Sequence, residues 1–136
     1  MSQSTQLSPE ALLEFSPYAR LIGMKLAVVD GDLRFFLPFQ QDNIGNDQLP
    51  ALHGGLIGGF MEMAAIMHLL WIRESHAVPR TVDFSIDYLR PGLARELFAS
   101  CSVTKHGQQI ANVQVSVWQD TPEKPVAVAR AHFLLN

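Results

Sequence analysis

The longest apolar run of the chain lies between residues 54 and 72, where Glu62 and His68 are the only polar side chains. A helix that is apolar on every side is typical of a buried helix. The run is also about long enough to cross a membrane, but a carboxylate near its middle disfavours that alternative. The pattern therefore predicts a long buried helix within residues 53–75 as the centre of the fold, with no membrane as partner.

Alternating apolar and polar positions predict strands on both sides of this helix. Before it, residues 24–29 and 33–39 are β-like runs separated by Asp30-Gly31-Asp32, and Asp-Gly between two such runs is a strong hairpin signal. After it, four consecutive strands are expected over residues 80–90, 96–105, 110–119 and 126–135.

The first of these four strands has the clearest alternation in the chain. Its period of two over eight residues predicts a half-buried strand. One set of side chains is expected to share one face: Val82, Phe84, Ile86 and Tyr88. The remaining set is expected to share the other face: Thr81, Asp83, Ser85 and Asp87.

The remaining segments complete a single domain over residues 1–136. Ser8-Pro9-Glu10 has the N-cap, the N1 proline and the acidic first turn of a short helix, so residues 1–19 are expected to form a helical extension. Residues 40–52 are expected to be a loop. The fold class is therefore α+β, with an antiparallel sheet of about six strands wrapped around one long buried helix.

Charge and cysteine content narrow the classes of partner. The net charge is −3 and no basic run is present, which argues against nucleic acid. Only 17% of the residues are charged, and this low fraction suggests that part of the surface is covered in an oligomer. Cys101 is the single cysteine, so no intrachain disulfide can form, and a cytoplasmic location is expected.

The apolar helix begins with four glycines in its first seven positions, Gly54, Gly55, Gly58 and Gly59. Each lowers helix propensity by roughly 1 kcal/mol relative to alanine, so the backbone is expected to lie close to a ligand or to another helix there. Three of these glycines are expected to share a face with Glu62. A carboxylate in such surroundings is costly unless it is used or paired, and His68 or an arginine is the alternative partner.

Two segments together resemble a known family. They are Leu52-His53-Gly54-Gly55 with Glu62 nine residues after the histidine, and the strand of residues 81–92, which ends in Tyr-Leu-Arg-Pro-Gly. This combination resembles the hotdog-fold acyl-CoA thioesterases, in the branch of the phenylacetyl-CoA thioesterases and of the 4-hydroxybenzoyl-CoA thioesterases that use glutamate. The resemblance covers about residues 20–135 and implies the hotdog fold and hydrolysis of an acyl-CoA thioester.

The resemblance also implies roles for individual residues. The backbone N–H of Gly54 or Gly55 would polarise the thioester carbonyl, and Glu62 would act as nucleophile or general base across a dimer interface. Thr81 would lie near the attacking water. His53 would orient the loop or assist at the carbonyl.

Further positions are expected to bind substrate. Family members often have Asn or Gln six residues before the histidine, where this chain has Asp47 with Asn46 beside it. Arg90 is expected to meet a phosphate of coenzyme A. The resemblance implies no metal and no cofactor other than coenzyme A as part of the substrate, and it implies a homodimer, possibly arranged as a dimer of dimers.

Two other functions remain open from the sequence. The departure at Asp47 is compatible with an acyl-CoA-binding hotdog protein that has lost catalysis. A hotdog dehydratase or hydratase is the second alternative, although its arrangement of histidine and acid is not found in this sequence.

Overall fold

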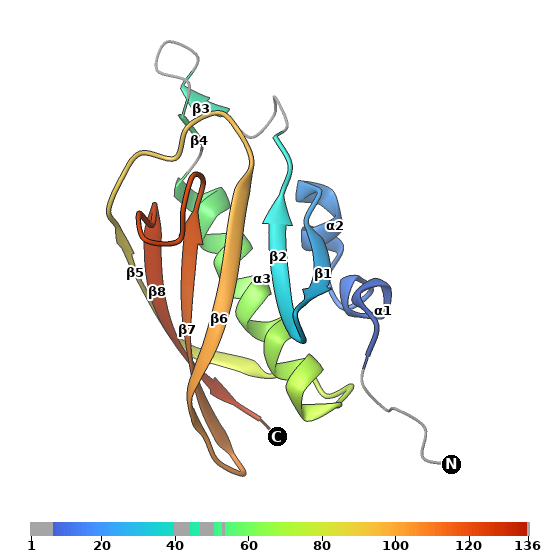
Figure 1. The fold of residues 1–136 in the computed structure, drawn as a ribbon. Helices are drawn as coiled ribbons and strands as arrows, with labels where there is room; N and C mark the ends of the chain where they lie inside the picture. The colour runs from blue at the N-terminus through green and yellow to red at the C-terminus, as the bar shows by residue number, and fades with distance from the viewer. Residues whose placement is uncertain (1–6, 40–43, 47–50, 53, 136) are drawn as a thin grey trace.

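A computed structural model describes residues 7–39, 44–46, 51–52 and 54–135. Its centre is one six-stranded antiparallel sheet, in the order β1-β2-β6-β7-β8-β5, that wraps around the helix α3 (Figure 1). The elements are α1 Pro9–Leu13, α2 Pro17–Ile22, β1 Lys25–Val29, β2 Asp32–Leu37, β3 Ile44–Asn46, β4 Ala51–Leu52, α3 Gly54–Arg73, β5 Arg80–Tyr88, β6 Leu97–His106, β7 Ile110–Trp118 and β8 Ala127–Leu134. The predicted fold class is confirmed, and the predicted long helix and six strands follow one another along the chain as expected.

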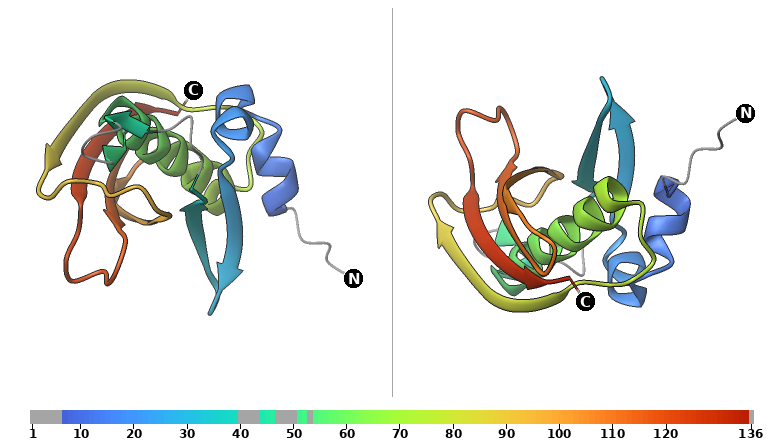
Figure 2. Two further views of the ribbon diagram at one scale, coloured as in Figure 1. Left: turned by 90° about the horizontal axis from the view of Figure 1, so that it is seen from above. Right: turned by 90° about the horizontal axis from the view of Figure 1, so that it is seen from below.

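Helix α3 fills the concave side of the sheet, as the two end-on views of Figure 2 show. Phe60, Met61 and Leu69 of α3 are completely buried, and they meet strand residues that alternate inward, such as Val113 and Val117 of β7. By length and composition α3 is apolar enough to cross a membrane, but 61% of its most apolar window is buried inside the fold. The helix is therefore the core element that its apolar pattern predicts.

Two short helices cover the end of the sheet formed by β1. The Ser8 hydroxyl caps α1 by accepting a hydrogen bond from the Ala11 N–H at 3.1 Å, and Ser16 caps α2 in the same way through the Ala19 N–H at 3.0 Å. Gly23 ends α2 with φ of +82°, a backbone conformation that favours glycine. The capping residues thus set both helices where the sequence places them.

The expectation of a loop over residues 40–52 is wrong for part of that segment. Strand β3 pairs with β4, with Ile44 opposite Leu52, in a separate two-stranded sheet. The Leu52 N–H also donates a hydrogen bond to the Gly92 carbonyl at 2.8 Å, which attaches the segment before α3 to the segment after β5. Strands of two and three residues are too short for alternation to indicate them.

His68 is buried in α3, and within the described residues one of its ring nitrogens is unpaired. Its side chain is 6% exposed and lies beside Trp71. Among the described residues its Nδ1 atom has no hydrogen-bond partner. Burial lowers the pKa of His68 below its ordinary value, and the nearby charge of Asp32 offsets part of this effect.

This lowered pKa predicts a loss of stability in acid. As the pH falls below about 6.5, the unfolded chain binds a proton at His68 while the folded chain does not. The free energy of unfolding should therefore decline until the pH reaches the lowered pKa of the folded state. Urea unfolding at a series of pH values should show a shallower decline for His68→Leu than for the wild type. The exposed His76→Leu is the control, and equal slopes for wild type and His68→Leu would contradict the prediction.

Candidate active site

The carboxylate of Glu62 lies half-buried in α3, beside the first residues of β5. The Thr81 hydroxyl donates a hydrogen bond to Glu62 Oε2 at 2.8 Å. Within the described residues Glu62 forms no ion pair, so the alternative of a buried pair with His68 or an arginine is not what the structure shows. The carboxylate is thus held by a neutral hydroxyl and not by a cation of the described residues.

A β-bulge turns Thr81 toward the helix. Thr81 pairs with Phe133 of β8, and Asp83 pairs with His132, the residue immediately before Phe133, so Val82 is an extra residue in β5. One extra residue inverts the facing of the side chains before it. Thr81 therefore faces α3 on the same side as Phe84, while Val82 is 61% exposed. The expected strict alternation is wrong at Thr81 and Val82 for this reason.

The second part of the site is the start of α3, formed by the exposed residues Gly54 and Gly55. The N–H groups of the first helical turn have no acceptor within a helix, and the aligned peptide dipoles give this end partial positive charge. A Cβ atom added at Gly55 would meet nothing within 4 Å. The backbone of this turn is therefore open to a ligand with a partial negative charge.

Tyr88, the last residue of β5, covers one side of this turn. Its hydroxyl donates a hydrogen bond to the Gly54 carbonyl at 2.6 Å, and its ring atoms would lie 3.6 Å from a Cβ atom at Gly54. The sequence pattern predicts Tyr88 as an apolar strand position and gives it no role in the site. The alternation predicts that the Tyr88 side chain faces the helix. It does not predict which helix residue the hydroxyl reaches.

The four glycines of α3 serve different neighbours. A Cβ atom at Gly59 would lie 2.5 Å from the Tyr18 hydroxyl of α2, so this glycine allows another helix to approach. A Cβ atom added at Gly58 would lie 3.5 Å from the Tyr88 hydroxyl. Of Gly55, Gly58 and Gly59, only Gly55 has an open Cβ position. The expectation that another helix lies close to the backbone is met at Gly59, whereas the neighbour of Gly58 belongs to a strand.

A groove of about 390 Å³ runs beside the glycine turn. Its wall is mostly apolar, with Leu52, Ile57 and Leu89 next to Tyr88. Arg90 lies at the groove, and its Nη1 atom donates a hydrogen bond to the Pro125 carbonyl at 2.6 Å. One guanidinium nitrogen of Arg90 is therefore hydrogen-bonded to the protein, and the side chain borders the groove.

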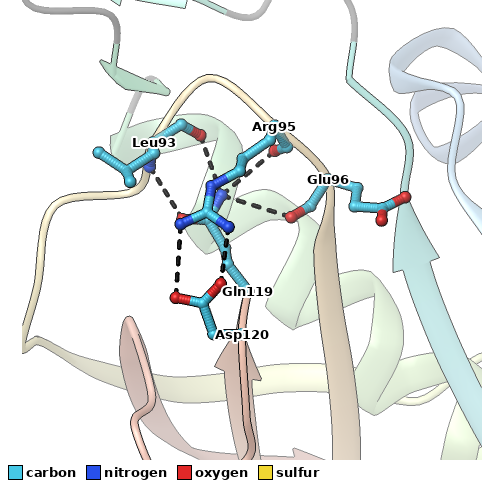
Figure 3. A network of polar contacts seen from close by, with 5 residues as sticks. All are labelled: Leu93, Arg95, Glu96, Gln119 and Asp120. Atoms are coloured by element: carbon cyan, nitrogen blue, oxygen red, sulfur yellow. Dashed lines mark hydrogen bonds and ion pairs between the residues drawn. The ribbon is translucent and has the colours of Figure 1, made fainter.

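The chain that continues from the groove to β6 is fixed by a polar network (Figure 3). The Gln119 Nε2 atom donates to the carbonyls of Leu93, Arg95 and Glu96 at 2.9 to 3.3 Å. Arg95 forms an ion pair with Asp120 at 2.6 Å, which lowers the pKa of that carboxyl group. These contacts attach the connection between β5 and β6 to the end of β7.

A larger hollow, of about 460 Å³, lies on the outer face of the sheet. Serine hydroxyls, Asp87 and Arg130 contribute to its lining, but neither Glu62 nor the glycine turn does. Cys101 also borders it, and burial, reinforced by the charge of Asp32, raises the pKa of the thiol well above its usual range. The thiol therefore stays protonated, in agreement with its expected place as a strand residue.

Some predicted site residues lie beyond what the structure describes. His53 and Asp47 are outside the described residues, and Asn46 is described only as the backbone end of β3. Within the described part of the chain, no group of three or more His, Cys, Asp or Glu side chains is placed to hold a metal ion. The structure thus brings together Glu62 with Thr81, and separately Gly54 and Gly55 with Tyr88 and Arg90.

The model of one protein family, the thioesterase superfamily, matches residues 49–126. This match includes α3, all of β5 and the groove between them. The chain belongs to the thioesterase superfamily.

Individual known proteins resemble the chain along nearly its whole length. The medium/long-chain acyl-CoA thioesterase YigI of Escherichia coli K12 is 25% identical over 148 residues, covering 98% of this chain and 95% of the relative. A crystal structure of a Chromobacterium violaceum protein is 54% identical, with a TM-score of 0.75 and coverage of 93% and 90%. A thioesterase-like protein related to phenylacetic acid degradation, from Ralstonia eutropha, is 24% identical, with a TM-score of 0.75 and coverage of 90% and 95%.

These findings confirm the resemblance and the hotdog fold predicted from the sequence. They support acyl-CoA thioesterase activity at the level of the family. The family match does not identify the reacting residues. The geometry of α3 and β5 bears on that point.

The different surroundings of the α3 glycines predict different effects on stability. Gly55→Ala should be neutral or raise the free energy of unfolding by up to about 1 kcal/mol, because alanine favours the helix. Gly59→Ala should be less stable than Gly55→Ala by about 1 to 3 kcal/mol, because its Cβ atom displaces Tyr18. Urea unfolding measures both.

The matched control removes the clash. In a Tyr18→Ala background, Gly59→Ala should recover most of the difference, which a double-mutant cycle would detect. Equal stability of the two alanine variants in the wild-type background would show that Tyr18 does not require Gly59.

Proposed function

We propose that this protein hydrolyses an acyl-CoA thioester to the free acid and coenzyme A. The observation that carries the proposal is the pair of features at the two ends of β5. Glu62 is held by Thr81 at one end, and the open Gly54–Gly55 turn lies beside Tyr88 at the other. Membership of the superfamily and the named activity of the E. coli relative support the same reaction.

Thioester hydrolysis requires the two kinds of group that these ends supply. Negative charge develops on the carbonyl oxygen, and peptide N–H groups at a helix N-terminus are aimed donors for such charge. The carboxylate of Glu62 either takes a proton from the attacking water or attacks the carbonyl carbon itself. In the first route the C–O bond forms to water, the C–S bond breaks, and the proton taken up by Glu62 passes to the departing coenzyme A thiolate. In the second route the C–O bond forms to Glu62 and the thiolate leaves, and water then hydrolyses the resulting anhydride to release the acid and restore the carboxylate. The Thr81 hydroxyl donates to Oε2 and leaves Oε1 for this role.

One chain does not place these groups around the same thioester. Gly55 and Glu62 lie seven residues apart on α3, which is about 10.5 Å along the helix axis. The reacting atoms have to approach within about 3 Å of one another. A complete site therefore needs Glu62 from one chain and the glycine turn from another.

Strand β5 provides the surface on which two chains can meet. It is an edge strand that pairs with β8 on its inner side, and exposed backbone groups of an edge strand can pair with a second chain. Around a twofold axis two copies of β5 would run antiparallel. With the axis at the middle of β5, Thr81 would lie opposite Tyr88 of the partner subunit, so that Glu62 would approach Gly55 of the partner subunit. This arrangement supports the expected homodimer.

The groove beside the glycine turn suits the substrate in two ways. Its apolar wall fits an acyl or pantetheine chain, and Arg90 offers a cation for a phosphate group. By analogy with the E. coli relative, we propose medium- or long-chain acyl groups as the first substrates to test. Release of free coenzyme A across acyl-CoA chain lengths tests the function. Tight binding without turnover would instead favour a non-catalytic acyl-CoA binder.

Replacing the carboxylate should remove turnover and preserve the fold. Glu62→Gln keeps the size of the side chain and an acceptor for Thr81, but it lacks the charge needed for proton transfer or attack. The expected loss in kcat is two to four orders of magnitude. Steady-state release of coenzyme A measures it, with Glu123→Gln in the exposed turn before β8 as the control. A folded Glu62→Gln protein that keeps more than about a tenth of the wild-type kcat would rule out the role.

A mixing experiment tests whether two chains share the site. Gly55→Val should be inactive because its side chain occupies the open space at the turn. Mixed dimers of Glu62→Gln and Gly55→Val chains should regain one working site of two, since one site receives both intact groups. The double variant Glu62→Gln/Gly55→Val is the control, because its dimers with wild-type chains contain no intact site. Absence of recovery after verified subunit exchange would place both groups in sites within single chains.

A further inference from the structure

The hydrogen bond between Tyr88 and Gly54 involves the same peptide group that contains the Gly55 N–H. The Tyr88 hydroxyl donates to the carbonyl oxygen of Gly54 at 2.6 Å, and the nitrogen of this peptide belongs to Gly55. The Gly55 N–H lies in the first turn of α3, where helices supply no acceptor. Its Cβ position is open. One peptide thus has a fixed carbonyl and an accessible donor.

A hydrogen bond to the carbonyl of a peptide changes the N–H at its other end. Hydrogen bonds in a chain polarise one another, and the effect is larger in surroundings of low dielectric constant. A donor on the Gly54 carbonyl draws electron density toward that oxygen, so the Gly55 N–H becomes a stronger donor. The same bond also resists rotation of a peptide between two glycines, which are the residues with the greatest backbone freedom.

We propose that Tyr88 is a positioning residue that orients and polarises the Gly54–Gly55 peptide, so that the Gly55 N–H stabilises the oxyanion of the thioester. This inference rests on the proposed thioesterase function. It assigns to β5 a part in catalysis at both of its ends, through Thr81 on Glu62 and through Tyr88 on the glycine turn.

The backbone around Tyr88 is held firmly enough for this task. Tyr88 pairs with Ala127 of β8. The two residues that follow, Leu89 and Arg90, donate their N–H groups to the Val126 carbonyl at 2.8 and 3.1 Å. The Arg90 side chain adds a bond to Pro125 at 2.6 Å. The phenol therefore projects from a strand end that is attached to β8 at several points.

Packing alone does not require the hydroxyl group. The Tyr88 side chain is 51% exposed, and a phenylalanine ring would keep the ring atoms that lie beside Gly54, whereas the neighbour of Gly58 is the hydroxyl itself. What phenylalanine lacks is the donor to the Gly54 carbonyl. Tyr88→Phe therefore separates the proposed role from that of a wall of the groove.

The first test compares Tyr88→Phe with Tyr18→Phe. These are the two tyrosines of the chain, and both rings lie against glycines of α3. Tyr88→Phe should lower kcat about tenfold, less than the loss of a direct oxyanion donor, and should leave KM within about twofold because the lost stabilisation arises in the transition state. Tyr18→Phe should leave kcat unchanged.

A second test strengthens the bond instead of removing it. In the Tyr18→Phe background Tyr88 is the sole tyrosine, so biosynthetic incorporation of 3-fluorotyrosine changes this position alone. Fluorine makes the phenol a stronger hydrogen-bond donor, and kcat should rise at a pH where the phenol stays protonated. A purely structural ring would give no such increase. In spectra of uniformly ¹⁵N-labelled protein, the Gly55 amide resonance should shift in opposite directions for Phe and for fluorotyrosine at residue 88.

The outcomes distinguish this inference from the proposed function. Wild-type protein that releases coenzyme A, together with a Tyr88→Phe variant of equal kcat or an unmoved Gly55 resonance, would overturn the role of Tyr88 and leave the function intact. A change confined to KM would assign Tyr88 to the groove wall and also overturn the inference. Wild-type protein without turnover on any acyl-CoA would overturn the proposed function and this inference with it.

Discussion

The contact between β5 and α3 is the constraint on which the site depends. The strand runs antiparallel to the helix, and each of its ends is bonded to a different part of it: Thr81 to Glu62, and Tyr88 to Gly54. Since β5 is paired with β8 along its length, the sheet determines where both bonds lie. The position of the carboxylate and the orientation of the helix start are therefore set by one element.

The sequence predicts the elements well because their signals are strong. A run of 19 residues with two polar side chains indicates a buried helix, and alternation along the later strands indicates a sheet that covers it. The bulge at Val82 has no such signal, because the alternation of residues 81–88 is regular in the sequence and the extra residue appears only in the pairing with β8. The same limit applies to β3 and β4, which are too short to show a period.

The glycines of α3 illustrate why the site was predicted only in part. In the sequence Gly55, Gly58 and Gly59 are equivalent, since each weakens the helix and each lies near Glu62 in the helical wheel. Their neighbours come from distant segments, Tyr18 of α2 and Tyr88 of β5, and only tertiary structure shows that Gly55 has neither. The resemblance to a family singles out the Gly54–Gly55 turn by its motif, but it does not identify the tyrosine that is hydrogen-bonded to this turn.

The position of β5 at the edge of the sheet connects assembly with chemistry. An exposed edge strand is a liability for a soluble protein, because its unpaired backbone groups can join other chains. If β5 pairs with its copy, this liability is removed, and the same pairing brings together two groups that lie about 10.5 Å apart along a single helix. A chain that remained alone would then keep both an exposed edge and an incomplete site. Selection for a protected edge and selection for activity would consequently favour the same interface. Activity would then depend on the two ends of β5, Thr81 and Tyr88, more than on its middle.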